Sequence, residues 1–168
     1  HERRALLGSW CLEGKAEETP SFYEAMCEAV GKERLVTTAD PTGLHDDSAR
    51  VMYQSDVVVL ALGESEKVTG ERRSVSDITL SNAQLELIRK AKCSGKKVVG
   101  VIFCGRPIAM DGVADYLDAV LYAWHSGSEA AGAACDILFG AQVPSGKTAI
   151  TFPRNSGHIP IYYNSTRN

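Results

Sequence analysis

Residues Val57 to Asp77 read VVVLALGESEKVTGERRSVSD, and this stretch decides the fold. Six apolar residues end at Gly63, which is typical of a parallel strand that is buried on both faces. A loop with three glutamates, three basic residues and a second glycine follows the strand. The sequence therefore predicts a central strand over 57–62 that opens onto a long polar loop.

Outward from this stretch, short apolar runs alternate with helical patterns, which indicates right-handed βαβ units. We expect a single α/β domain over residues 1–168. It should be a three-layer sandwich, with a mainly parallel sheet of about five to six strands and helices on both faces. The predicted strands are 34–39, 57–62, 97–103, 119–124 and 148–152, and the predicted helices are 20–30, 46–55, 82–94, 112–117 and 128–139.

Capping residues mark the starts of two of these helices. Thr19 followed by Pro20 has the pattern of an N-cap with proline at the first helical position. Ser81 and Gln84 have the spacing of a capping box.

The composition is that of an ordinary globular domain, with 44% hydrophobic residues, 23% charged residues and a net charge of −3. No basic block is present, so nucleic acid is not an expected partner. No apolar run approaches the ~20 residues that span a bilayer, so a membrane is not expected either. The chain begins at His1 without a recognisable signal peptide, and we expect it to be a fragment or a processed product.

The five cysteines are widely spaced and contain no CxxC pair. This pattern favours buried thiols in a reducing compartment over a metal site or a disulfide framework, so a cytoplasmic location is favoured. No cofactor is expected. The segment AQVPSGKT (141–148) nearly matches a phosphate-binding loop, but it lies between a predicted helix and a predicted strand, the reverse of the order that phosphate binding requires. A turn is the favoured interpretation of this segment.

Ligands of parallel sheets bind at the carboxyl ends of the strands, which places the loops after Leu62, Phe103 and Trp124 at the functional edge. The first of these loops carries several candidate carboxylates. From the pattern alone, a solvated charge is favoured over a catalytic role for each of them. Glu64 could be a partly buried structural acid, and Glu71, in the middle of the loop after Gly70, could reach beyond the domain. The candidates are Glu64, Glu66, Glu71 and Asp77.

Three further residues have two interpretations each. Trp10 is flanked by glycines, so it is either a core residue, which the pattern favours, or a loop aromatic that stacks on a sugar. Arg106, in the turn GRP, is either an ion-pair strut between loops, which is favoured, or a ligand contact. His125 directly follows the predicted strand 119–124, and a structural role is favoured because no nucleophile motif accompanies it.

Taken together, several motifs give a more specific hypothesis. The segments GSW, SDVVVLALGE, SGKKVVGVIFCGRPI, DAVLYAWHSGSEAAGAACDILFG and VPSGKTAITFPRNSGHIPIYYN occur in this order. The set resembles the C-terminal α/β sandwich domain of glycoside hydrolase family 3, the β-glucosidases and their relatives. The likeness runs from about Arg3 to Asn164.

The resemblance implies a role for two of the candidates. Family members have an N-terminal (β/α)8 barrel that carries an aspartate nucleophile, and the sandwich domain contributes the acid/base glutamate. The family's glutamate matches Glu71, and its aromatic residue in G-x-W matches Trp10, in the wall of the leaving-group subsite. The implied reaction is retaining hydrolysis of a β-glucoside or oligosaccharide. The implied partner is the barrel of the same protein, through a surface that could also allow the chain to form a homo-oligomer.

Because one carboxylate of the pair belongs to the barrel, the isolated chain is predicted to be inactive. A non-catalytic module of the same fold, which binds carbohydrate or a partner protein, is the alternative. A flavodoxin-like nucleotide-binding domain ranks last, because the chain has no glycine loop for phosphate.

Overall fold

The structure, a computed structural model, describes residues 3–38, 46–162 and 164. Its centre is a parallel sheet with the strand order β1-β2-β3. Strand β1 (Val57–Gly63) pairs with β2 (Lys97–Phe103), and β2 pairs with β3 (Ala119–Tyr122). The register aligns Gly63 with Phe103, so β1 and β2 end at the same level.

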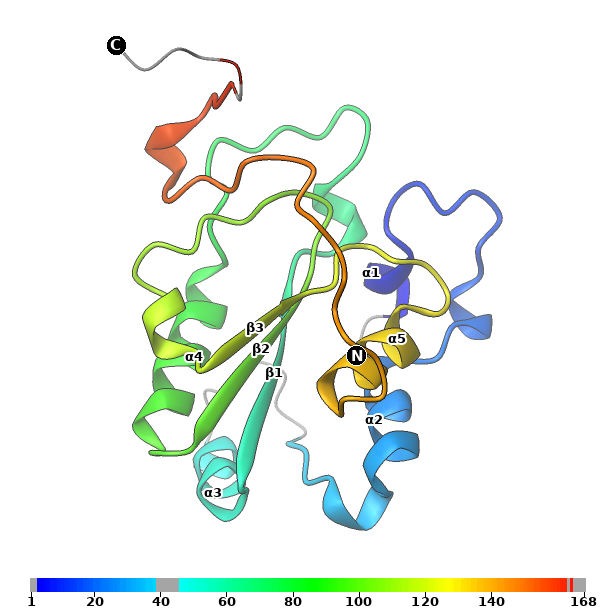
Figure 1. Cartoon of the computed structure of the whole chain (residues 1–168), viewed down its shortest axis with the longest axis vertical. Helices are drawn as coiled ribbons and strands as arrows, with labels where there is room; N and C mark the ends of the chain where they lie inside the picture. Colours follow the sequence, from blue (N-terminus) through cyan, green and yellow to red (C-terminus); the bar gives the residue numbers. More distant parts are fainter. Residues whose placement is uncertain (1–2, 39–45, 163, 165–168) are drawn as a thin grey trace.

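Helices cover both faces of the sheet (Figure 1). Helices α3 (Asp46–Gln54) and α4 (Asn82–Cys93) lie on one face. Helices α1 (Arg3–Leu7), α2 (Phe22–Val30) and α5 (Ala130–Leu138) lie on the other. The three-layer α/β sandwich predicted from the sequence is therefore present. Short 3₁₀ helices lie in the connections: η1 (Ala16–Glu18), η2 (Lys32–Arg34), η3 (Glu66–Val68), η4 (Ala114–Tyr116) and η5 (Ser156–His158).

Each face of the sheet has its own apolar core. On the α4 side, Ile88 packs with side chains of β1 and β2, among them Leu60 and Ile102. On the α5 side, Ala131 packs with Val101 and Phe103 of β2. Strand β2 contributes to both cores and is buried along all its length except at Lys97 and Val99, which makes it the central strand. The 57–62 segment was predicted to be a central strand that is buried on both faces, but β1 is an edge strand of this sheet, and its buried residues alternate with exposed or half-buried ones. The buried Val58, Leu60 and Leu62 belong to the core on the α4 side, and the residues between them lie on the other face, which is less completely covered.

The strand count of five to six is not confirmed, since the described residues form a sheet of three strands. The predicted strand at 148–152 is wrong: residues 148–151 are exposed, and no strand of the described sheet lies beside the segment to exchange hydrogen bonds with it. It is attached by a side chain instead, because the Phe152 ring packs against Tyr122 and Trp124. The predicted strand at 34–39 is also absent over 35–38, where the chain is irregular after η2, and residue 39 lies outside the described residues.

The start of α2 differs by two residues from its prediction. Ser21, not Thr19, is the N-cap: its hydroxyl accepts a hydrogen bond from the Glu24 amide (3.2 Å), and the Glu24 carboxylate accepts one from the Ser21 amide (2.7 Å). Thr19 is fully buried and donates its hydroxyl to the Lys15 carbonyl (3.1 Å). Glu24 completes a reciprocal box only with a residue three places before it, and this spacing selects Ser21.

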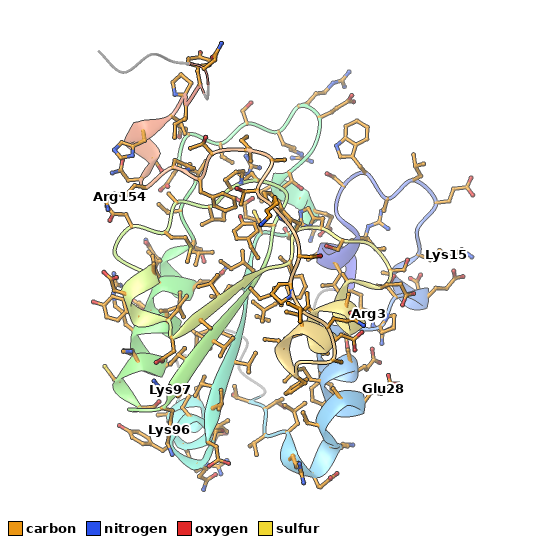
Figure 2. The ribbon with its side chains drawn as sticks, viewed as in Figure 1. Arg3, Lys15, Glu28, Lys96, Lys97 and Arg154 are labelled. Carbon is orange, nitrogen blue, oxygen red and sulfur yellow. The ribbon has the colours of Figure 1, made fainter. Side chains whose placement is uncertain are left out.

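The two ends of the sheet differ in character. Lys96 and Lys97 lie at the amino end of β2, where Lys97 pairs with Asp118 at 2.7 Å (Figure 2). The long connections lie at the carboxyl end, together with the segment that contains Arg154 (Figure 2). Among the described residues, none of the helices combines the length and the apolar character that crossing a membrane requires.

Ile88 tests the contribution of α4 to the core, because its side chain is 0% exposed. We expect Ile88→Ala to lower the free energy of unfolding by about 2–5 kcal/mol, since it leaves a cavity between α4 and the sheet. Urea denaturation of the chain measures this change. The matched control is Ile150→Ala, at a side chain that is 56% exposed, which should stay within about 0.5 kcal/mol of the wild type. Equal effects of the two substitutions would contradict the packing described.

Candidate functional site

The loops at the carboxyl ends of the strands surround a cleft of about 630 Å³. Four segments far apart in the sequence line it: the loop after α1, the loop after β1, the turn after β2 and the residues after β3. Two tryptophans, a histidine and several hydroxyl groups face this space. The lining includes Ser9, Trp10, Thr69, Cys104, Trp124 and His125.

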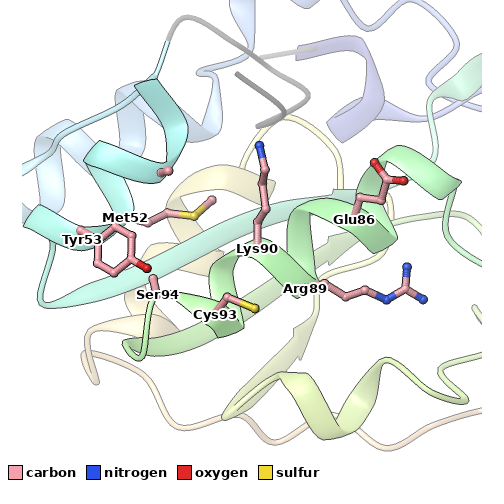
Figure 3. Close-up of a pocket in the computed structure, with 8 residues that line it drawn as sticks. Met52, Tyr53, Glu86, Arg89, Lys90, Cys93 and Ser94 are labelled. Carbon is pink, nitrogen blue, oxygen red and sulfur yellow. The ribbon is translucent and has the colours of Figure 1, made fainter. Parts of the chain in front are cut away.

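A second, smaller pocket of about 420 Å³ lies between α3 and α4 (Figure 3). Met52 and Tyr53 of α3 and Glu86, Arg89 and Lys90 of α4 line it. This pocket contains none of the residues that the sequence singled out. The cleft at the carboxyl edge is therefore the candidate site.

Gln84 fixes the point where β1 opens onto its loop. Its carboxamide accepts a hydrogen bond from the Gly63 amide and donates one to the Gly63 carbonyl, both at 2.8 Å. Ser81 caps α4 by accepting a hydrogen bond from the Gln84 amide (3.4 Å), but the Gln84 side chain does not return to Ser81 as a capping box requires. Only the Ser81 half of the predicted capping box is therefore formed. The Gln84 side chain, which would complete the box, binds the end of β1 instead.

Only glycine fits at position 63. A Cβ there would lie 1.8 Å from the carbonyl oxygen of Phe103, and the φ of +129° also disfavours other residues. This close approach lets the Glu64 amide donate a hydrogen bond to the Phe103 carbonyl at 3.0 Å. The loop after β1 therefore starts in contact with the end of β2.

An ion pair between Glu64 and Arg106 then joins the two loops. Arg106 Nε lies 2.9 Å from Glu64 Oε2, and the two side chains are 21% and 13% exposed. Arg106 also donates a hydrogen bond to the Val68 carbonyl through Nη2, further along the loop. The geometry confirms the interpretations of Arg106 as a strut and of Glu64 as a partly buried structural acid.

The buried thiol of Cys104 and the half-buried phenol of Tyr122, both close to the ion pair, keep their protons. Burial raises the pKa of the Cys104 thiol to about 12, so the thiol can donate a hydrogen bond to Glu64 Oε2 at 3.2 Å. Burial also raises the pKa of Tyr122, whose hydroxyl donates to the Arg106 carbonyl and accepts from the Ile108 amide at 3.0 Å. The turn that carries Arg106 is therefore bonded to Glu64 on one side and to Tyr122 on the other.

Glu71 and Trp10 lie on two loops that touch. Gly70, with φ +99°, packs against the loop after α1: a Cβ at Gly70 would lie 2.5 Å from Ser9 Oγ and 3.8 Å from Trp10 Nε1. The hydroxyls of Ser9 and Thr69 are 3.4 Å apart. The Glu71 side chain is exposed and that of Trp10 is 67% exposed, so the core interpretation of Trp10 is wrong.

The other acids of the loop are placed differently. Asp77 accepts hydrogen bonds from the Thr79 hydroxyl (2.8 Å), the Thr79 amide (2.9 Å) and Ser156 (3.1 Å). These bonds, with those from Thr79 first, lower the pKa of Asp77 and make it a turn residue that also holds the C-terminal segment. Glu66 lies in η3, where its Oε2 is buried and has no hydrogen-bond partner within the described ranges. Of the four acids, Glu71 combines exposure with contact between its loop and Trp10.

Some residues that contribute to this edge were not predicted from the sequence. Trp124, the last residue of the predicted strand 119–124, lies beyond the end of β3, has φ +57° and packs edge-to-face against Tyr122 with ring centroids 4.7 Å apart. Gln84 was predicted only as part of a capping box, and Thr69 was not singled out, because the partners Gly63 and Ser9 are 21 and 60 residues away in the chain. In the part of the chain that the structure describes, no three His, Cys, Asp or Glu residues gather in a way that could hold a metal ion.

Comparison with known proteins identifies relatives over nearly the whole chain. The sequence model of the glycosyl hydrolase family 3 C-terminal domain matches residues 1–168. A periplasmic β-glucosidase of Salmonella typhimurium is 32% identical over 96% of this chain, and a β-xylosidase of Formosa agariphila is 29% identical over 97%. The chain spans about a quarter of the length of these relatives, 25% and 24% respectively.

Solved structures agree with these matches. The crystal structure of the β-glucosidase from Listeria innocua in complex with isofagomine superposes with a TM-score of 0.89 and 35% identity, over 98% of this chain and 24% of that one. A family 3 β-glucosidase of Bifidobacterium adolescentis superposes with a TM-score of 0.71 and 26% identity, over 84% of this chain and 22% of that one.

The ion pair provides a test of how the edge is held. We expect Arg106→Met to lower the free energy of unfolding by roughly 1–3 kcal/mol, because it leaves Glu64 partly buried without its charged donor. Denaturant titration of the chain measures this loss. Adding Glu64→Gln to Arg106→Met should recover part of it, since the uncompensated charge is then gone.

The control for this pair is Lys15→Met, which breaks the exposed ion pair with Glu18 (2.9 Å). It should cost about 0–1 kcal/mol. A loss from Arg106→Met no larger than this, with no recovery in the double variant, would show that Arg106 is not a strut.

Proposed function

The chain belongs to glycosyl hydrolase family 3, as its C-terminal domain, and on this basis we propose that it is part of a retaining glycosidase of the β-glucosidase type. In this proposal, Glu71 is the acid/base catalyst and Trp10 forms part of the leaving-group subsite. The substrate is a β-glucoside or an oligosaccharide. The similarity to β-glucosidases of known structure supports this class of reaction.

One observation carries the assignment of the two residues. Gly70 packs on Ser9 and next to the Trp10 indole nitrogen, so an exposed carboxylate and an exposed aromatic ring extend from touching loops at the carboxyl edge of the sheet. A leaving sugar needs both groups: an aromatic face for its C–H surface and an acid for the departing oxygen.

The chemistry then follows the retaining pathway. A nucleophilic carboxylate attacks the anomeric carbon while Glu71 gives its proton to the glycosidic oxygen, and the leaving group departs. Glu71, now a carboxylate, takes a proton from the water that attacks the glycosyl-enzyme, which releases the sugar and the nucleophile. Retaining enzymes hold the two carboxyl groups about 5–5.5 Å apart.

The nucleophile comes from the remainder of the protein in this proposal, from an N-terminal barrel domain. The chain accounts for about a quarter of the length of its relatives, which leaves room for such a domain. Exposed apolar side chains on the segment after α5 are suited to dock against it or to join two copies of the chain. They are Phe139, Val143, Ile150, Ile161 and Tyr162. The isolated chain should be inactive, and the cytoplasmic location stays a prediction.

Glu71→Ala in the full-length protein tests the catalytic assignment. We expect kcat/KM to fall by about 10²–10⁴ on substrates whose leaving group needs protonation, because general acid catalysis has this magnitude. Azide should partly restore turnover of an activated aryl glycoside, since it attacks the glycosyl-enzyme without a general base. Steady-state kinetics with and without azide measure both effects.

The matched control is Asp77→Asn, which keeps an acceptor oxygen for Thr79 and should leave the kinetics close to those of the wild type. Unchanged kinetics of Glu71→Ala would remove Glu71 from the site and favour the non-catalytic binding module.

Trp10→Ala tests the leaving-group subsite. We expect kcat/KM for a disaccharide to fall roughly tenfold, which corresponds to ~1.4 kcal/mol, the size of an aromatic stacking contact. A glycosyl fluoride should be hydrolysed almost normally, because its leaving group does not reach the ring. Leu12→Ala, at a neighbouring side chain that is 91% exposed, is the control and should leave both substrates unaffected. Equal losses on both substrates would place Trp10 outside this subsite.

A further inference from the structure

His125 lies between two loops as a spacer. A Cβ on Gly8 would be 2.8 Å from His125 Cβ and 2.9 Å from Cγ, and a Cβ on Gly105 would be 2.9 Å from Cδ2. The imidazole ring is thus in contact with the backbone of both glycines, one in the loop after α1 and the other in the turn after β2. The side chain of His125 therefore fills the space between these two segments.

Only one of the two ring nitrogens of His125 has a hydrogen-bond partner among the described residues. Its Nδ1 lies 2.6 Å from the Ala5 carbonyl oxygen, and an acceptor there requires the hydrogen on Nδ1. Its Nε2 is buried and has no hydrogen-bond partner among the described residues. A buried nitrogen without a partner is unfavourable, and an apolar side chain would avoid this cost. The ring therefore contributes its shape and the hydrogen bond that it donates through Nδ1.

The two backbone segments that His125 contacts are connected to both proposed functional residues, Trp10 and Glu71. Gly8 directly precedes Ser9 and Trp10, and Ser9 supports Gly70, the residue before Glu71. On the other side, a Cβ on Gly105 would also lie 3.3 Å from the Thr69 methyl group. A displacement of the ring would thus move the Trp10 loop and the Glu71 loop relative to each other.

We propose that His125 is a positioning residue that sets the separation of Glu71 and Trp10, and through it the transfer of the proton to the leaving group. This inference rests on the proposed function of these two residues. His125 acts through its bond to Ala5 and its contact with Gly8, without touching the substrate. The expected consequence is selective: reactions that depend on protonation of the leaving group slow down, and reactions with activated leaving groups do not.

The test uses the full-length protein and a series of aryl glycosides whose leaving groups differ in basicity. His125→Leu removes the donor to Ala5 and replaces the flat ring by a branched side chain. We expect its kcat/KM to fall roughly ten- to a hundredfold on the most basic leaving groups and little on the most activated ones, the size of loss expected when a reacting group is misplaced by about 1 Å. His125→Asn, which retains a donor near the position of Nδ1, should restore part of the loss.

Gly105→Ala moves the ring from its other side without removing it, and serves if His125→Leu does not fold. Gly105 does not have a positive φ, so the main effect of the added Cβ is its contact with the imidazole at 2.9 Å. We expect the same selective loss on basic leaving groups. A parallel loss on all substrates, or a folded variant with the wild-type dependence on the leaving group, would overturn the inference.

Glu71→Ala in the same series separates the two proposals. If Glu71→Ala leaves the dependence on leaving-group basicity unchanged, the proposed function fails and the role of His125 fails with it. If Glu71→Ala makes this dependence steep while the His125 and Gly105 variants resemble the wild type, only the role of His125 is refuted.

Discussion

The ion pair between Glu64 and Arg106 is the interaction on which the functional edge depends. Parallel pairing of β1 and β2 brings the ends of the two strands to one level, but it does not fix the polar loop that follows Gly63. The Arg106 guanidinium reaches both Glu64 and the Val68 carbonyl and so holds the first turn of this loop. The pair is mostly shielded from water. In such a shielded position a charged hydrogen bond is stronger than in water, and a charge without a partner is costly.

At this edge, the residues that hold the loops in place are not the residues that face solvent. Glu64, Arg106, Cys104 and Tyr122 are buried or partly buried and bond to one another or to the backbone. Glu71 and Trp10 lie beyond them and face solvent. The proposed function, in which Glu71 acts in a site shared with another domain, requires such an arrangement: a rigid support, and side chains that are free to contact the rest of the site.

Much of the architecture could be predicted because it depends on local periodicity. The apolar runs at 57–62 and 97–103 became β1 and β2, and the helical stripe after Ser81 became α4. The segment at 148–152 has the same β-forming character but is not a strand, since a strand exists only where a neighbour offers its hydrogen bonds. Its attachment by Phe152 to Tyr122 and Trp124 has no counterpart in local sequence.

For the site, the residues quoted from the sequence suggested the family and, through it, Glu71 and Trp10 as candidates. The sequence by itself determined the order of the segments that became β1, β2 and β3 and the helices α2 to α5, and hence which loops reach the carboxyl edge, because these follow from periodicity and chain direction. Only the tertiary structure decided that Gln84 holds Gly63, that Gly70 rests on Ser9 and that His125 separates Gly8 from Gly105. These contacts join residues far apart in the chain, and their geometry is set by the packing of helices on the sheet, which no single segment encodes.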